Sequence, residues 1–299
     1  GLGDVYKRQD YNGPILDWPV YERVKETPEE ISEIRANYAS LVTMVDEYFG
    51  KLLDFFETHG LWDDTAIIVT TDHGFLLGEH DWWAKNRMPV YDEIAHIPLM
   101  IYHPDFLNQK GQRREALTQT IDIMPTLLEM FDIQAPSDVS GKSLMTTLGD
   151  DQKIRNSAIF GYFGSSCNIT DGRYTYFRYP EKMSADGLYE YTLMPTRMTS
   201  RFSIEELAGA TLSDPFSFTK GLKLLKLKPK VSEDGVPLEV QGMSFEDTRS
   251  QLYDVLKDPK QESPFENLNI VNYLLREMSQ HLKLSDAPGE SFGRFGLKT

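Results

Sequence analysis

The sequence predicts an α/β fold in which a mixed sheet is flanked by helices. Three observations lead to this class: a long segment of helical period at residues 28–59, two short apolar runs at 65–71 and 97–102, and a second helical segment at 122–130. Helices that alternate with buried strands are typical of layered α/β domains. With 299 residues, of which 40% are hydrophobic, the chain is long enough for a sizeable core.

The first helix has clear signals at both ends. Thr27 is a good N-cap, Pro28 suits the first helical position, and Glu30 completes a capping box. Gly60 is a natural stop. Because the apolar stripe between these ends is broad, we expect it to pack against a sheet. Its members are Ile31, Ile34, Tyr38, Leu41, Val45, Phe49, Leu52, Leu53 and Phe56.

The run at 65–71 is rich in β-branched residues, which predicts a strand that is buried on both faces. This strand ends at Asp72-His73-Gly74. In open α/β sheets, ligands bind beyond the carboxyl ends of strands, so polar residues placed there are candidates for a site. Residues 97–102 predict a second strand.

From about residue 151 the pattern changes to short strands. We expect strands at 158–162 and 173–177, with the turn Asp171-Gly172 between them as a hairpin signal. An edge strand at 251–254 and a helix around 271–284 should follow. Residues 181–248 have weak periodicity and should be loops with a helix near 204–210. We therefore predict three regions: 1–9 as a non-native segment, 10–150 as an α/β domain, which the resemblance described below implies is the C-terminal half of a catalytic domain, and 151–299 as a smaller α+β subdomain that carries specificity loops.

Composition limits the partners. A net charge of −15 argues against a nucleic-acid partner, which needs a basic surface. No apolar run approaches the roughly 18 residues of a membrane span. The single cysteine, Cys167, cannot form an internal disulfide and favours a cytoplasmic location. The chain opens with Gly1-Leu2-Gly3 rather than methionine, so a signal peptide upstream stays open.

Chemistry concentrates in residues 71–102. Asp72 and His73 are adjacent candidate ligands for a divalent cation at a strand end: a carboxylate favours a hard cation, and an imidazole extends the choice to manganese or zinc. Lys85 follows in an aromatic loop, where Trp82 and Trp83 could shield it from water. A lysine beside a metal-bound anion would neutralise charge that develops in a transition state.

This segment resembles the formylglycine-dependent sulfatases of the alkaline phosphatase superfamily, which carry a T-[ST]-D-H/N-G motif, then a lysine, then a strand of the form H-[IV]-P-L. Other pieces agree in the family's order: residues 37–46 resemble its long helix, 121–128 its D-x-x-P-T-L-L helix, 141–144 the close of its main domain, and 252–259 a late strand and turn. The resemblance is good over residues 37–151 and scattered beyond.

The resemblance implies an alkaline-phosphatase-like sandwich and hydrolysis of a sulfate ester, carried by a small molecule or a glycan. Asp72 and His73 would bind the metal, which we expect to be calcium, with magnesium or manganese as alternatives. Lys85 would contact the sulfate and serve catalysis. The family's nucleophile is a formylglycine made within a C/S-x-P/A-x-R motif, and these residues contain no such motif. We therefore expect the chain to represent a C-terminal portion that is inactive alone, with the formylglycine in an upstream segment.

Several alternatives stay open. His80 is a weaker candidate for substrate binding and Arg87 weaker still, whereas Cys167 fits an inert thiol. Lysines 220, 223, 226, 228 and 230 form either a solvated face or a cradle for an anionic glycan. The scaffold also suits a phosphodiesterase or phosphonate monoester hydrolase, because Asp72, His73 and Lys85 do not separate sulfate from phosphate. A non-catalytic glycan-binding relative would not need the metal ligands.

Overall fold

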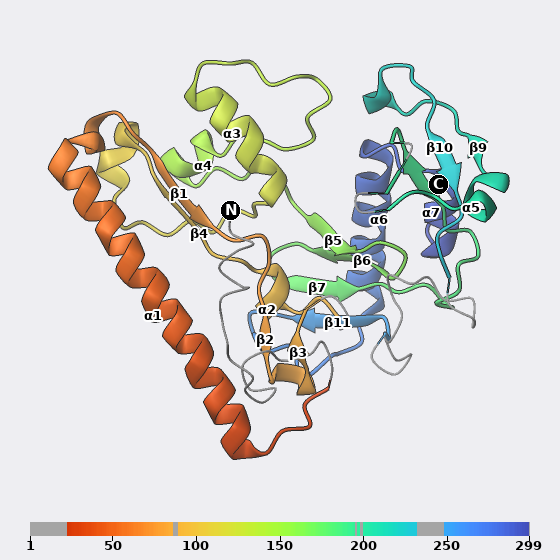
Figure 1. Ribbon diagram of the computed structural model, residues 1–299, viewed down its shortest axis with the longest axis horizontal. Coiled ribbons are helices and arrows are strands. Elements are labelled where there is room, and N and C mark those ends of the chain that lie inside the picture. Colours follow the sequence, from red (N-terminus) through yellow and green to blue (C-terminus); the bar gives the residue numbers. More distant parts are fainter. Residues whose placement is uncertain (1–22, 86–88, 195, 198–199, 232–247, 299) are drawn as a thin grey trace. The chain divides into compact units, whose positions relative to one another are not determined.

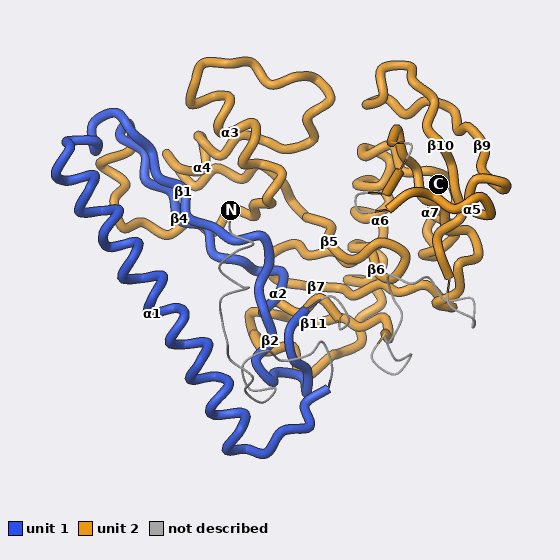
Figure 2. The backbone as a smooth tube through the Cα atoms, in the orientation of Figure 1, with its two compact units in different colours: residues 1–86, 93–105 blue, residues 87–92, 106–299 orange. Residues whose placement is uncertain are grey.

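A computed structural model describes residues 23–85, 89–194, 196–197, 200–231 and 248–298 (Figure 1). The chain divides into two compact units (Figure 2). Unit 1 comprises residues 1–86 and 93–105, and unit 2 comprises residues 87–92 and 106–299. The predicted segment 1–9 lies outside the described residues, and the predicted boundary at residue 150 stays a prediction.

Helix α1 of unit 1 spans Pro28–His59, as predicted. The Thr27 hydroxyl accepts a hydrogen bond from the Glu30 backbone N–H at 3.3 Å, and the Glu30 carboxylate accepts one from the Thr27 N–H at 2.8 Å. Gly60 ends the helix in the left-handed conformation, with φ 64°. These reciprocal bonds satisfy amides that a helix start otherwise leaves unpaired.

The expectation that α1 packs its apolar stripe against a sheet is wrong for the described residues. Only Ile34 and Phe56 of this helix are buried, whereas Val45 is 62% exposed. Seven other large apolar side chains of the helix are exposed as well: Tyr38, Leu41, Val42, Met44, Tyr48, Leu52 and Phe55. An apolar stripe of this extent is typical of a surface that another element covers.

Unit 1 contains two paired strands, which lie in the two apolar runs that the sequence predicted as strands. Strand β1 (Ile67–Thr70) and strand β4 (Leu99–Tyr102) are antiparallel, and Ile67 pairs with Tyr102. The prediction that the first strand is buried on both faces is wrong: its residues are half-buried and Thr70 is exposed. Among the described residues no third strand extends this pair, so its edges and faces have little cover.

The rest of unit 1 is a small hairpin and a short helix. Strand β2 (Leu76–Leu77) pairs with strand β3 (Trp83–Ala84), and helix α2 covers Asp92–Ala95. Trp83 is 1% exposed and packs with Ile34 and Ala84 in a local core. The Trp83 indole N–H also donates to the Glu26 carboxylate at 2.6 Å. The hairpin is therefore anchored against the first turns of α1.

Unit 2 is built on a four-stranded antiparallel sheet in the order β11-β7-β6-β5. The strands are β5 (Ala158–Tyr162), β6 (Ser166–Thr170), β7 (Tyr174–Phe177) and β11 (Gln251–Asp254). Helix α6 (Leu268–Leu284), capped by Asn267, packs on this sheet. Its Leu274 and Met278 are fully buried.

Strand β6 was not predicted. The turn Asp171-Gly172 joins β6 to β7, whereas β5 pairs with β6 rather than with β7. The strand is hard to recognise because its sequence is Ser-Cys-Asn-Ile-Thr, which lacks an apolar alternation although four of its five residues are buried. Burial on both faces with polar side chains gives no periodic signal.

Smaller elements complete unit 2. Helix α3 (Ile123–Met130) and the edge strand β11 agree closely with their predicted positions. Helices α4 (Met145–Asp150), α5 (Ile204–Ala208) and α7 (Gly289–Arg294) are short. Residues 181–248, expected as loops with one helix, also contain a three-stranded sheet of β8 (Glu190–Thr192), β10 (Leu225–Leu227) and β9 (Thr211–Leu212). In the described part of the chain, no helix is long and apolar enough to cross a membrane.

Candidate active site

Asp72 and His73 follow directly after β1, where the sequence analysis placed them. The Asp72 carboxylate is 80% exposed and lies 3.2 Å from His73 Nε2. The backbone N–H of His73 donates to Asp72 Oδ1 at 3.0 Å. Desolvation acts to raise the pKa of Asp72, but this hydrogen bond and the adjacent imidazole hold it below its ordinary value. The carboxylate is therefore ionised at neutral pH and available to a cation.

The hairpin β2–β3 brings Lys85 to the same place. Leu76 pairs with Ala84, so the chain returns antiparallel and residue 85 meets residue 73. The Lys85 ammonium contacts His73 Nε2 directly. His80, Asp81 and Ala84 have positive φ values of 53°, 65° and 73°. Such conformations cost energy for residues other than glycine and concentrate at functional sites.

The tautomer of His73 follows from its neighbours. Its Nδ1 lies 2.9 Å from the Gly74 carbonyl oxygen, which can only accept a hydrogen bond. Nδ1 therefore carries a proton, and Nε2 faces the Lys85 ammonium and the Asp72 carboxylate. A backbone carbonyl that orients an imidazole in this way is common around metal-binding histidines. Nε2 cannot bind a metal and accept from Lys85 at once, so the lysine would have to move when a cation binds.

Gly74 is required by a close approach of two backbone segments. Its N–H donates to the Ile94 carbonyl at 2.9 Å. A Cβ at this position would lie 1.8 Å from the Glu93 carbonyl oxygen, far inside van der Waals contact. The glycine thus lets the segment that carries Asp72 and His73 rest against helix α2, which fixes the start of the loop.

The resemblance implies a divalent metal, and Asp72 and His73 are the residues that would hold it. Their chemistry fits in part: an ionised, exposed carboxylate stands beside an imidazole nitrogen, and Lys85 contacts that nitrogen. Within the described residues, however, no cluster of three or more His, Cys, Asp or Glu side chains could hold a metal ion. The described part of the chain therefore offers two candidate ligands, which is fewer than the six to eight oxygens typical of calcium.

The weaker candidates lie differently. His80 is nearly buried, with its Nε2 3.5 Å from the Glu93 carboxylate, and its part in substrate binding stays a prediction. Arg87 lies outside the described residues. Cys167 is buried in the sheet of unit 2, where desolvation raises the pKa of its thiol to about 12. Such a thiol is unreactive at neutral pH, as the sequence suggested.

Three of the five lysines at 220–230 form ion pairs with acidic side chains. Lys220 Nζ lies 3.4 Å from the Asp138 carboxylate, Lys226 Nζ 2.8 Å from that of Glu290, and Lys230 Nζ 4.0 Å from that of Glu206. Hydrogen bonds that the Lys226 ammonium donates to Glu290 and Tyr191 raise its pKa. Lys226 also lies over the ring of Tyr189. These pairs favour the reading as a structural, solvated face over that of a glycan cradle.

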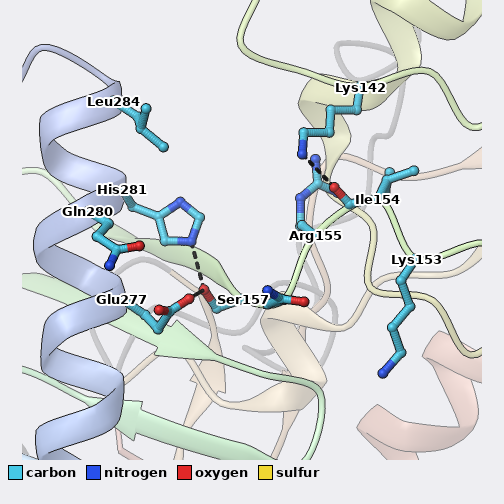
Figure 3. A pocket seen from close by; sticks show the side chains of 10 residues that line it. Lys142, Lys153, Ile154, Arg155, Ser157, Glu277, Gln280, His281 and Leu284 are labelled. Atoms are coloured by element: carbon cyan, nitrogen blue, oxygen red, sulfur yellow. Dashed lines mark hydrogen bonds between the residues drawn. The ribbon is translucent and has the colours of Figure 1, made fainter.

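One group of polar residues gave no signal in the sequence. Lys142, Arg155, Ser157, Glu277 and His281 line a pocket of unit 2. They come from loop segments before β5 and from helix α6 (Figure 3), and more than 100 residues separate Ser157 from Glu277 and His281. No motif spacing could have found them, because only tertiary folding brings the segments together.

Two family profiles match the chain. The profile described as Sulfatase matches residues 7–133, and the profile described as N-sulphoglucosamine sulphohydrolase, C-terminal, matches residues 78–210. The chain belongs to the sulfatase family. This confirms the resemblance found from the motifs, since the first match includes Asp72, His73 and Lys85 and both include the loop that carries Lys85.

Individual relatives agree with this assignment. An N-acetylglucosamine-6-O-sulfatase of Bacteroides thetaiotaomicron is 31% identical over 163 residues, which is 53% of this chain and 27% of that protein. The multifunctional alkaline phosphatase superfamily protein PehA of Trinickia caryophylli is 36% identical over 121 residues, 40% of this chain and 23% of that protein. The matched part is thus about a quarter of each relative, which agrees with the expected C-terminal portion of a sulfatase.

A solved structure confirms the fold class. A protein described as in complex with its substrate D-glucosamine-2-N,6-O-disulfate matches 96% of this chain and 46% of its own, with a TM-score of 0.60 and 19% sequence identity. Another match is a sulfatase structure from Bacteroides thetaiotaomicron, with a TM-score of 0.58 and 17% identity over 89% of this chain and 46% of its own. The fold is the alkaline-phosphatase-like fold of the sulfatases, with mixed helices and sheets.

Proposed function

We propose that Asp72, His73 and Lys85 form part of the active site of a metal-dependent sulfatase, which hydrolyses the sulfate ester of a small molecule or glycan. The observation that carries the proposal is the convergence of three side chains: Lys85 contacts His73 Nε2, and the same nitrogen lies 3.2 Å from the Asp72 carboxylate. The hairpin places them together although 12 residues separate Lys85 from His73. Family membership supports the reaction class.

In this proposal each side chain has a distinct role. Asp72 and His73 would hold a divalent metal, with calcium expected and magnesium or manganese as alternatives. The metal, when bound, would act as a Lewis acid toward the sulfate oxygens. Lys85 supplies a positive charge to the anionic group and stabilises charge that develops as the ester bond breaks. A formylglycine nucleophile is expected upstream, because residues 1–299 contain no C/S-x-P/A-x-R motif.

The rival reaction is hydrolysis of a phosphodiester or a phosphonate monoester on the same scaffold. The similarity to the multifunctional alkaline phosphatase superfamily protein PehA supports keeping it. The ionised Asp72 and the Lys85 ammonium would serve either anion equally well. The nucleophile separates the two: a formylglycine favours sulfate esters, whereas a threonine favours phosphate chemistry. Parallel assays with an aryl sulfate and a bis-aryl phosphate would decide between them.

Exchange of Asp72 and His73 for alanine tests the metal assignment. In the complete enzyme this double variant should lose bound metal in elemental analysis, because the remaining carboxylates would hold a hard cation loosely. His96→Ala is a matched control, since it removes an imidazole that follows helix α2 and is expected to be structural. Full metal occupancy in the double variant would refute the assignment.

Lys85→Ala tests the role in chemistry. Removal of a preorganised charge should cost about 3 kcal/mol in the transition state, which lowers kcat/KM by roughly 10²-fold. Lys110→Ala, on a surface turn, should be neutral. Activity of the Lys85 variant within about threefold of wild type would show that this lysine is a surface residue.

The 299-residue chain alone should not release sulfate from an aryl sulfate, and metal-dependent release would mean that it contains its own nucleophile.

A further inference from the structure

Glu93 of helix α2 contacts two separate parts of unit 1 that meet at the candidate active site. Its carbonyl oxygen packs against Gly74, whose N–H donates to the carbonyl of the next residue, Ile94, at 2.9 Å. Its carboxylate lies 3.5 Å from His80 Nε2, in the turn that joins β2 to β3. One short helix therefore touches both the segment that follows β1 and the hairpin β2–β3.

The contact between His80 and Glu93 is sheltered from water. The side chain of His80 is 9% exposed and that of Glu93 is 26% exposed. The two atoms that face each other, the imidazole Nε2 and a carboxylate oxygen, are both buried. A buried carboxylate oxygen is costly unless a polar partner compensates it, and solvent screens such a pair only weakly. The pair therefore holds the turn of the hairpin to helix α2.

The backbone of this turn needs contacts that hold it. His80 and Asp81 have φ values of 53° and 65°, and Ala84, which directly precedes Lys85, has a φ of 73°. Residues other than glycine rarely adopt this left-handed region, and they persist there only where their surroundings fix them. Without the contact to α2 the turn would relax toward ordinary φ values. The displacement would pass along β3 to Lys85, which is five residues from His80 in the chain.

A second point of attachment holds the hairpin to helix α1. Arg35 of that helix donates from Nε to the Leu77 carbonyl at 2.7 Å. A hairpin that is fixed at one point can pivot about it, whereas two points on different elements fix its direction. The pair of His80 and Glu93 supplies the second point, on the same helix that supports Gly74. It therefore couples the direction of the hairpin to the segment that carries the candidate metal ligands.

We propose that His80 and Glu93 are positioning residues for the Lys85 ammonium. Glu93 fixes His80, His80 fixes the turn, and the turn fixes β3 and the lysine that follows it. The inference rests on the proposed function, in which Lys85 stabilises charge that develops as the ester bond breaks. It gives His80 a role that differs from the substrate contact expected from the sequence, because a positioning residue acts on kcat through the lysine and needs no contact with the substrate.

Two substitutions of His80 separate its side-chain contact from its backbone conformation. Glutamine can place an amide N–H near the position of the imidazole Nε2 and so reach Glu93, whereas asparagine is too short. Asparagine suits a left-handed backbone better than glutamine does. If the side-chain contact matters, His80→Gln should therefore be the more active variant, although its backbone preference is the worse of the two.

Steady-state kinetics of the complete enzyme measure this difference. His80→Asn should lower kcat roughly ten- to a hundredfold, because misplacement of a catalytic group by about 1 Å can cost about 10²-fold. KM should stay within about twofold, because the lost interaction belongs to the transition state. His80→Gln should recover most of the rate. A rise in KM with unchanged kcat would mean a substrate contact, and a His80→Gln variant no better than His80→Asn would mean a backbone effect; either result would overturn the proposal.

Double variants test whether His80 acts through its partners. In the Lys85→Ala background, His80→Asn should cause no further loss of kcat, because the group that it positions is gone. Glu93→Ala combined with His80→Asn should be no worse than the more severe single variant. Asp81→Asn is the matched control: it lies in the same left-handed turn, and its carboxylate is 3.6 Å from Arg23. It should leave kcat unchanged. Additive losses in either double variant, or an equal loss in the control, would refute the positioning role.

A measurement without turnover separates this proposal from the proposed function. The 299-residue chain contains six histidines, which can be labelled with ¹⁵N and observed by NMR in the absence of added metal. The Nε2 signal of His73 reports its contact with Lys85. His80→Asn should move this signal in the same direction as Lys85→Ala does, and Asp81→Asn should not.

The two readouts fail in different ways. If Lys85→Ala leaves turnover intact while His80→Asn still moves the His73 signal, the proposed function fails and the positioning of Lys85 stands. If Lys85→Ala abolishes turnover but His80→Asn neither lowers kcat nor moves the His73 signal, the proposed function stands and the positioning role is overturned.

Discussion

Replacement of Asp122 by asparagine should strongly destabilise unit 2. The Asp122 side chain is fully buried, and its carboxylate accepts hydrogen bonds from the Gln119 backbone N–H at 2.7 Å and the Lys142 N–H at 2.8 Å, as well as from both terminal nitrogens of Arg155. Asparagine keeps the shape but removes the charge and one acceptor. The Arg155 guanidinium, 7% exposed, would then be a buried charge without its counterion.

Loss of one partner from a buried ion pair costs about 3–5 kcal/mol. With a urea m-value of about 2 kcal/mol/M, the unfolding midpoint should fall by about 1.5–2.5 M. Asp254→Asn is a matched control, because Asp254 pairs with Arg173 at 3.0 Å in the same unit but that arginine is 47% exposed. The Asp254 side chain is only 10% exposed, but its removal leaves an arginine that water reaches, so the loss should stay at about 1 kcal/mol and the midpoint should shift by about 0.5 M.

Far-UV circular dichroism during urea titration measures both variants. All four tryptophans lie at positions 18, 62, 82 and 83, so tryptophan fluorescence reports unit 1 separately. The double variant Asp122→Asn with Arg155→Met should recover part of the loss, because it removes the unbalanced charge. If Asp122→Asn and Asp254→Asn lose equal stability, or if the double variant is worse than the sum of its parts, the argument from burial is refuted.

Three further predictions follow from single sites. Gly74→Ala should weaken metal retention in the complete enzyme and destabilise unit 1 by about 1–3 kcal/mol, because its Cβ would clash with the Glu93 carbonyl; metal retention equal to that of wild type in elemental analysis would contradict this. The fold lowers the pKa of His281, because it favours the neutral ring. The contribution of this ring to the free energy of unfolding is therefore complete above the unfolded pKa of about 6.5. It is lost as the pH falls below that value, because the ring must then give up a proton in order to fold. The melting temperature should therefore fall from pH 7 to pH 5 less steeply in His281→Gln than in wild type, and identical slopes would contradict it. The Cys167 thiol, with its pKa raised to about 12 by burial, should resist alkylation at pH 8 until urea unfolds the chain; rapid labelling of the folded chain would show that the thiol is accessible.

The sequence by itself determined the local elements with strong chemical signals. Thr27, Pro28, Glu30 and Gly60 specify the ends of α1 through caps that depend only on neighbouring residues. The apolar run at 65–71 and the motif Asp72-His73-Gly74 that follows it placed the candidate site at a strand end. These signals are local in the chain, so they can be read without knowledge of the fold.

Tertiary structure decided what depends on distant partners. The polar strand β6 is buried because β5, β7 and helix α6 surround it, and no periodicity in Ser-Cys-Asn-Ile-Thr could show this. The contact of Lys85 with His73 depends on the register of the β2–β3 hairpin, which spacing alone does not fix. The apolar stripe of α1 and the faces of β1 were predicted as buried, yet in the described chain most of the stripe is exposed and β1 is only half-buried. Whether an apolar face is buried depends on the element that packs against it as well as on the segment itself. A sequence pattern predicts only which face of a segment is apolar.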